Sequence, residues 1–146
     1  MPSSLPSLRS KTPSRILLVG EAVPQLGEAW RLAADVRPDW FFAVAGTLLT
    51  AQRHLEEHAF HAVIVDGGEM GVGGEVLRLV RQRWPDTKRV AVVSRGAWAH
   101  PESHEGCAVV GLPVRPAMLL ATLDDLLGPP VSLRMRRDTQ SQRPPS

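Results

Sequence analysis

The chain has 146 residues, of which 43% are hydrophobic and 22% charged, with a formal net charge of +2. This composition is typical of one globular domain and excludes an intrinsically disordered chain or a fibre. No apolar run approaches the ~18 residues that a transmembrane helix needs, and the single cysteine excludes an intrachain disulfide. The first fifteen residues also lack the apolar stretch of a signal peptide, so we expect a cytoplasmic protein.

Charge is divided unevenly between the ends and the middle of the chain. Residues 1–15 and 129–146 together carry seven bases and one acid, so residues 16–128 hold ten bases and fourteen acids, a net charge of −4. Both ends are also rich in proline. We therefore predict flexible tails at 1–15 and 129–146 around one folded domain, 16–128, whose mildly acidic surface argues against nucleic-acid binding.

Short apolar runs alternate along this domain with longer segments of helical periodicity. The runs have the length and apolar character of strands buried on both faces, and they cover residues 16–19, 40–45, 62–65, 90–93 and 108–112. Apolar residues at i, i+3 and i+4 spacing predict helices over residues 24–36, 47–59, 74–84 and 116–127. Residues 95–106, which contain glycine and proline, predict at most a short helix.

Residues at the expected helix ends support these boundaries. Pro24 and Pro116 suit first-turn positions, where the missing N–H costs nothing. Thr47 can cap the second helix, and Pro85 ends the third because it cannot continue the hydrogen-bond ladder.

Five strands with intervening helices predict an α/β domain of the flavodoxin-like kind. Its doubly wound, five-stranded parallel sheet has the strand order 2-1-3-4-5 in a three-layer αβα arrangement. In this fold the functional crevice lies outside the carboxyl ends of strands 1 and 3, where the winding reverses. Those ends are Gly20-Glu21 and Asp66, so two carboxylates from distant parts of the chain should face one crevice.

Four segments resemble, in degenerate form, the CheY-like receiver domain of two-component response regulators. They cover nearly all of the domain and are RILLVGEA (15–22), AVIVDGGEMGVGGEVLRLVRQRWPDT (62–87), RVAVVSRG (89–96) and VVGLPVRPAMLLATLDDLL (109–127). The resemblance implies that Asp66 accepts a phosphoryl group from a histidine kinase and that Ser94 is the hydroxyl that senses it. It further implies an Mg²⁺ site at Glu21, Asp66 and the backbone carbonyl of Gly68, and a cis peptide bond before Pro113.

Three positions depart from the pattern that the resemblance implies. Gly20 stands in place of the first acid of a pair after strand 1, Leu112 in place of a lysine, and Val109 in place of an aromatic residue. A carboxylate that attacks an anionic phosphoryl group needs cations to offset the repulsion. We therefore expect phosphotransfer to be weak or absent, and Mg²⁺ binding to be weak.

Structural alternatives for the candidate site residues stay open at this point. Asp66 could cap the turn after its strand, Glu21 could be a solvated loop residue, and Ser94 could belong to an ordinary turn. Pro113 could close the fifth strand in the trans form.

Three further features of the sequence favour structural interpretations. His54 and His58 have a spacing that suits a metal ligand pair, but a solvated helix face is favoured. Residues 68–74 lack the pattern of a phosphate-binding loop, and their last two glycines allow a helix to approach closely. Cys107 is interpreted as a small buried residue.

These observations predict a stand-alone receiver-like signalling protein that is not an enzyme. It would act by protein–protein contact through the helix over 116–127 and its neighbours, since no nucleophile–base pair or cofactor fingerprint is present. Two alternatives are a pseudo-receiver scaffold that works without phosphorylation and an anion or nucleic-acid binder that acts through its basic tails. Fifteen arginines against two lysines indicate a GC-rich bacterial genome.

Overall fold

The computed structural model describes residues 13–67, 72–93 and 106–128, which contain a single five-stranded parallel sheet. Its strands are β1 (Ser14–Val19), β2 (Trp40–Ala45), β3 (Ala62–Asp66), β4 (Lys88–Val93) and β5 (Ala108–Gly111). They lie in the order β2-β1-β3-β4-β5, and every neighbouring pair is parallel. The flavodoxin-like sheet and its strand order are therefore confirmed.

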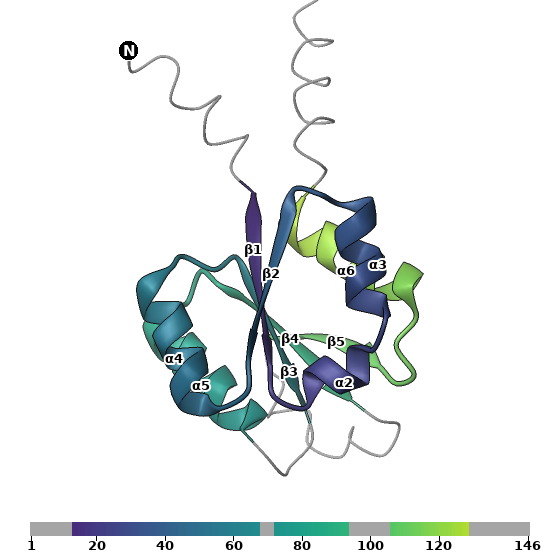
Figure 1. The fold of residues 1–146 in the computed structure, drawn as a ribbon. Helices are drawn as coiled ribbons and strands as arrows, with labels where there is room; N and C mark the ends of the chain where they lie inside the picture. The colour runs from purple at the N-terminus through teal and green to yellow at the C-terminus, as the bar shows by residue number, and fades with distance from the viewer. Residues whose placement is uncertain (1–12, 68–71, 94–105, 129–146) are drawn as a thin grey trace, which may run out of the picture.

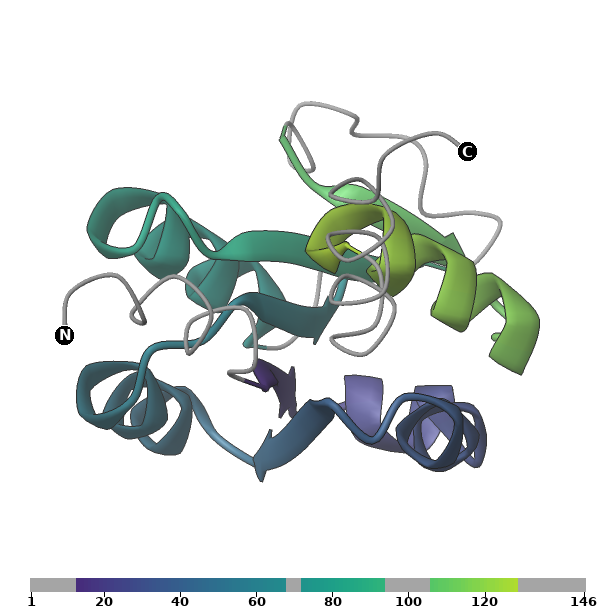
Figure 2. The ribbon, with the colours of Figure 1, turned by 90° about the horizontal axis from the view of Figure 1, so that it is seen from above.

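Helices cover both faces of the sheet. One face carries α4 (Leu48–Glu57) and α5 (Gly73–Arg83), and the other carries α2 (Ala22–Leu26), α3 (Ala29–Val36) and α6 (Pro116–Leu127) (Figure 1). Seen from above, the sheet separates these two helical layers, and β2 forms one outer edge (Figure 2). The arrangement is the three-layer αβα sandwich that the sequence predicts.

The alternation of side chains along the central strands builds a separate core on each face. Ile16 and Leu18 of β1 point toward α2, α3 and α6, whereas Leu17 and Val19 point toward α4 and α5. All four are buried, so both faces of β1 are apolar, as a strand between two helical layers requires.

The predicted helix over residues 24–36 is wrong as a single element, because it is two helices that break at Gly27. Gly27 has a φ of 54°, a conformation that suits glycine and ends α2. Leu26 before the break and Ala33 after it pack into the same core. The apolar periodicity therefore continues across the break and hides it in the sequence.

The remaining boundaries differ from the prediction by at most two residues. β1 and β4 each begin two residues earlier, and α4 ends two residues earlier, than predicted. Ser14 and Arg15, placed in the tail by the sequence analysis, belong to β1, and the Ser14 N–H bonds to the Asp39 carbonyl at 2.8 Å. The short helix expected within residues 95–106 lies almost entirely outside the described residues.

Thr47 caps α4 as predicted. Its hydroxyl accepts from the Thr50 N–H at 3.1 Å, and the Thr50 hydroxyl accepts from the Thr47 N–H at 3.0 Å. This reciprocal capping box satisfies N–H groups that a helix leaves without partners in its first turn.

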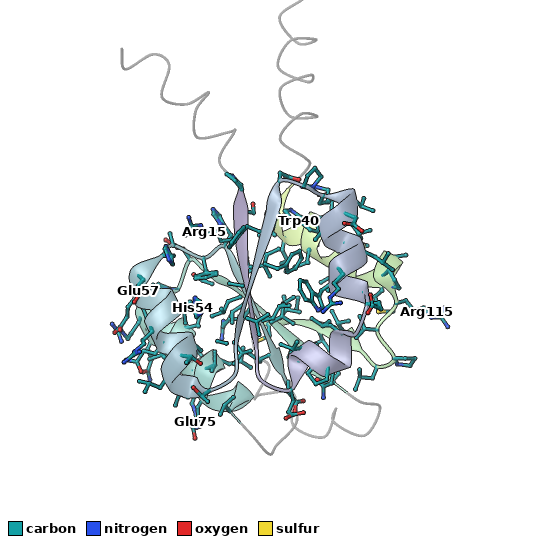
Figure 3. The ribbon with its side chains drawn as sticks, viewed as in Figure 1. Arg15, Trp40, His54, Glu57, Glu75 and Arg115 are labelled. Atoms are coloured by element: carbon teal, nitrogen blue, oxygen red, sulfur yellow. The ribbon has the colours of Figure 1, made fainter. Side chains whose placement is uncertain are left out.

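A buried arginine ties the start of β2 to the end of α6. Arg37 is 5% exposed and bonds to both carboxylate oxygens of Asp39 at 3.0 Å. It also donates to Asp124 at 2.6 Å and to the Gly128 carbonyl at 3.2 Å. Its guanidinium lies 4.1 Å from the ring centre of Trp40, on the side of the sheet that α3 covers (Figure 3). These contacts hold the start of β2 against the end of α6.

Among the helices of the described residues, none has the length and apolar character required to cross a bilayer.

Candidate functional site

A hollow of about 160 Å³ opens at the carboxyl ends of β1 and β3. It is lined by Val19, Gly20, Glu21, Gly46, Asp66, Val72 and Gly73. Glu21 and Asp66 are 45 positions apart in the chain, yet both line this one hollow. The crevice is where the strand order reverses direction, which is the place the sequence predicts for the two carboxylates.

Asp66 is the last residue of β3 and is half-buried. It is paired with Val92 of β4, and the Gly67 N–H that follows donates to the Val92 carbonyl at 2.8 Å. The pairing fixes the backbone of Asp66 on both sides of its Cα. Residues 68–71, which follow shortly after Asp66, lie outside the described residues, so the capping alternative stays open.

Gly73 brings the first turn of α5 onto the backbone of Asp66. A Cβ at Gly73 would overlap the Asp66 carbonyl oxygen and lie 3.0 Å from its carbonyl carbon. Only glycine permits this approach, as the sequence predicts for this pair of glycines. At Gly74, in contrast, an added Cβ would meet nothing within 4 Å.

Glu21 also lines the hollow and is exposed. It is the N-cap residue of α2, but its side chain makes no capping hydrogen bond. Its carboxylate is therefore not committed to the helix end. The same end of the sheet also carries Glu75, in the first turn of α5, outside the hollow itself (Figure 3).

The local backbone explains why the first position of the acidic pair is glycine. Gly20 has a φ of 57°, which an L-amino acid with a side chain adopts only with strain. A Cβ at Gly20 would also lie 3.3 Å from a methyl carbon of Val72. A second carboxylate at this position therefore conflicts with the conformation of the chain.

Leu112 takes the place of the lysine as an apolar core residue. Its side chain is half-buried and packs against the cluster that includes Val110 and Leu119, and it does not line the hollow. The Leu112 N–H donates to the Val93 carbonyl at 2.9 Å. The Leu112–Pro113 peptide bond is cis, the form that the resemblance implies.

The donor set of the hollow fits a magnesium ion held mainly by water. Mg²⁺ is usually bound by one or two carboxylates with water at its other positions, and Glu21 and Asp66 supply two carboxylates. No group of three or more His, Cys, Asp or Glu side chains suited to a metal occurs in residues 13–67, 72–93 and 106–128. Gly68 and Ser94, the other predicted site residues, lie outside this described part of the chain.

The histidines near α4 make contacts that account for them without a metal. The ring of His54 meets Phe60 edge-on at 6.2 Å, and that of His58 does so at 6.5 Å. His58 has an extended backbone at the C-cap of α4, so the helical spacing of the two histidines does not hold. The predicted solvated face is therefore only partly correct, because His54 is half-buried.

Cys107 is half-buried beside the core that α4 and α5 cover. Burial raises the pKa of its thiol, and the positive charges of Arg89 and Arg81 oppose this rise with smaller effects. A thiol that ionises above its usual range is a poor nucleophile at neutral pH, which agrees with the structural interpretation.

Gly46 and Val72 line the hollow, although the sequence analysis did not single them out. Gly46 follows β2 and Val72 precedes α5, so both reach the carboxyl edge of the sheet. The signal for Gly46 was present, because it comes directly after a predicted strand that neighbours strand 1. Val72 carries no such signal, since its position depends on how closely α5 approaches β3.

Comparison with solved structures identifies the fold as that of response-regulator receiver domains. The chemotaxis response regulator CheY4 of Vibrio cholerae superposes with a TM-score of 0.66 at 19% identity, covering 80% of this chain and 100% of that one. The signal receiver domain of an HD domain-containing protein from Pseudomonas fluorescens Pf-5 superposes with a TM-score of 0.63 at 20% identity, covering 79% and 94%.

A third structure, an uncharacterized protein from Neptuniibacter caesariensis, superposes with a TM-score of 0.66 at 20% identity, covering 90% of this chain and 97% of that one. No protein-family model matches the sequence, and no curated protein matches it. The chain thus has the receiver fold, at no more than 20% sequence identity to these three structures.

Proposed function

We propose that this protein is a receiver-like signalling protein of the two-component type that acts by protein–protein contact. Asp66 is its candidate phosphoacceptor, and phosphotransfer to Asp66 is weak or absent. The observation that carries the proposal is the shared hollow, in which Asp66 at the end of β3 faces the same space as Glu21 after β1. The receiver fold of the structural neighbours supports the same interpretation.

The surroundings of Asp66 support slow chemistry. The attacking carboxylate and the incoming phosphoryl group are both negative, so catalysis depends on cations placed where charge develops. Losing one such preorganised contact typically costs roughly 10²–10³ in rate. Leu112 packs against the core and is uncharged, so it cannot stabilise the negative charge of a phosphoryl group.

Magnesium would supply the remaining positive charge if it binds. Glu21 and Asp66 would hold it, and the bound cation would reduce the repulsion between the Asp66 carboxylate and a phosphoryl oxygen. Glu21 is one methylene longer than aspartate and is exposed, so it loses side-chain entropy when it is fixed on a cation. We therefore propose weak Mg²⁺ binding.

The partner would be another signalling protein, with a histidine kinase as one such partner, in the cytoplasm of a bacterium. We place the contact on α6 and its neighbours, where Met118 is an exposed apolar side chain in the first turns of the helix. The proposed role is recognition, so the protein would not be an enzyme.

The test is incubation with a small phosphodonor and Mg²⁺, followed by intact mass measurement. We expect slow or trace gain of one phosphoryl group in the wild type, and none in Asp66→Asn. Fast and complete gain in the wild type would contradict the proposed impairment.

The backbone at Gly20 favours a second candidate function, a scaffold that works without phosphorylation. Its φ of 57° disfavours a residue with a carboxylate side chain at this position. A protein that works without phosphoryl transfer does not need this second carboxylate. This candidate predicts that binding of an identified partner is the same for the wild type, Asp66→Asn and Asp66→Glu. A partner whose affinity changes in either variant would exclude it.

A further inference from the structure

The strand β2 is an edge of the sheet that none of the described elements covers. It lies outermost in the strand order and is bonded only to β1 within the described residues. In Figure 1 it passes in front of the sheet, and in Figure 2 it lies at the outer border, between α4 and α3.

The backbone of β2 offers hydrogen-bonding groups along this edge. The Asp39 and Ala45 carbonyls accept from Ser14 and Gly20 of the β1 segment, each at 2.8 Å. Every second residue of a strand turns its backbone to the same neighbour, so residues 39, 41, 43 and 45 face β1. Phe42 and Val44 therefore turn their N–H and C=O groups outward.

β2 lacks the features that usually prevent an edge strand from pairing with another chain. Natural edge strands are protected by charged side chains, proline, bulges or short length. The sequence of β2, WFFAVA, has no charge and no proline over its six residues. The opposite edge, β5, is shorter, with four residues.

Exposed apolar side chains gather on the same border of the molecule. Six large hydrophobic residues are exposed in the described part of the chain, and five of them belong to β2 or to the two helices that contact it, α3 and α4. These five are Leu32, Val36, Phe41, Val44 and Leu49. Exposed apolar side chains beside an unpaired strand edge favour association with another chain.

We propose that β2 pairs with β2 of a second copy of this chain, in antiparallel orientation, to form one continuous sheet. An antiparallel pair of identical strands is self-complementary about a two-fold axis. With the axis at Ala43, Phe42 of each copy exchanges hydrogen bonds with Val44 of the other. The axis is perpendicular to the sheet, so α3 meets its copy on one face and α4 meets its copy on the other.

The size of this border agrees with a stable dimer. Six residues span about 20 Å of edge, and the sheet with a helix on each side is about 30 Å thick. Pairing then covers on the order of 600 Å² per copy, which reaches the lower end of stable interfaces at about 1,200 Å² in total. Backbone hydrogen bonds and the five apolar side chains supply the attraction.

The test is the mass of the full chain in solution, measured by light scattering during gel filtration from low to high micromolar concentration. We expect the wild type to approach twice its 15.9 kDa as concentration rises. Val44→Pro removes an outward N–H that β1 does not use, and Val44→Lys places a charge on the edge. Both variants should lose the dimer while keeping the melting temperature of the monomer.

Glu75→Lys is the control, because Glu75 is exposed on α5, outside the proposed interface, and the variant adds a lysine as Val44→Lys does. It should dimerise like the wild type, with slowed amide exchange at Phe42 and Val44 in the dimer. A wild type that stays monomeric, including one that pairs only with a strand of another protein, would overturn the proposal. So would a dimer that survives both Val44 variants.

Discussion

Replacement of Gly73 by alanine tests the contact that holds α5 against the end of β3. Gly73 is buried, and a Cβ there would overlap the backbone carbonyl of Asp66. The backbone fixes the position of the Cβ and the carbonyl belongs to the main chain, so no rotamer change relieves the overlap and α5 must shift away from β3. Overpacking of this kind costs about 1–3 kcal/mol.

Gly74→Ala is the matched control on the next residue of the same helix. Gly74 is exposed and its added Cβ would meet no atom within 4 Å, so alanine should stabilise the helix by about 0.5–1 kcal/mol. In thermal unfolding followed by circular dichroism, Gly73→Ala should lower Tm by roughly 4–12 °C and Gly74→Ala should raise it by roughly 2–4 °C. Equal Tm values for the two variants would refute the reasoning.

Three further predictions concern stability. Arg37→Met removes the buried guanidinium that bonds to both carboxylate oxygens of Asp39 and should cost about 3–5 kcal/mol in urea unfolding, whereas Asp124→Asn, at a carboxylate 52% exposed, should cost at most about 1 kcal/mol. Equal costs would contradict the buried pair. Thr47→Ala removes the capping box and should cost about 1 kcal/mol in the same assay; no loss would show that the cap is dispensable. Burial raises the pKa of the Cys107 thiol, so above the unfolded-state value the thiol ionises in the unfolded chain first and unfolding is favoured. The stability of the wild type should therefore fall more steeply than that of Cys107→Ala as the pH rises above about 8.5, the usual pKa of an exposed thiol; parallel curves would contradict this.

The sheet was predictable because its strands carry nearly continuous apolar runs. β2 over Trp40–Ala45 and α6 over Pro116–Leu127 match the predicted ranges, since an apolar run and a first-turn proline mark their limits. Polar residues at the start of a strand gave no such signal. Lys88 and Arg89 extend β4 through backbone pairing alone, with partners in β3.

The break at Gly27 shows where periodicity misleads. Trp30 and Ala33 stay in register with Leu26 across the break, so the spacing predicts one helix where the backbone forms two. Glycine alone does not end a helix, and the positive φ that ends this one arises from how the chain turns over the sheet.

Parts of the site followed from topology, and parts required coordinates. Glu21 and Asp66 could be placed together because parallel strands end at one edge and the strand order brings β1 beside β3. The conformation of Gly20 could not be predicted, because its φ depends on the loop that joins β1 to α2. The Arg37 network likewise depends on Asp124, 87 positions away, and no local pattern reports such a pair.

Magnesium titration observed by two-dimensional NMR tests most directly whether Glu21 and Asp66 form one site. Millimolar Mg²⁺ should shift the amide signals of Glu21 and Gly67 together, and Asp66→Asn or Glu21→Gln should each remove the shifts. Glu75→Gln, at an exposed carboxylate outside the hollow, should leave them unchanged. Shifts that are absent from these amides, or that persist in both site variants, would contradict the account.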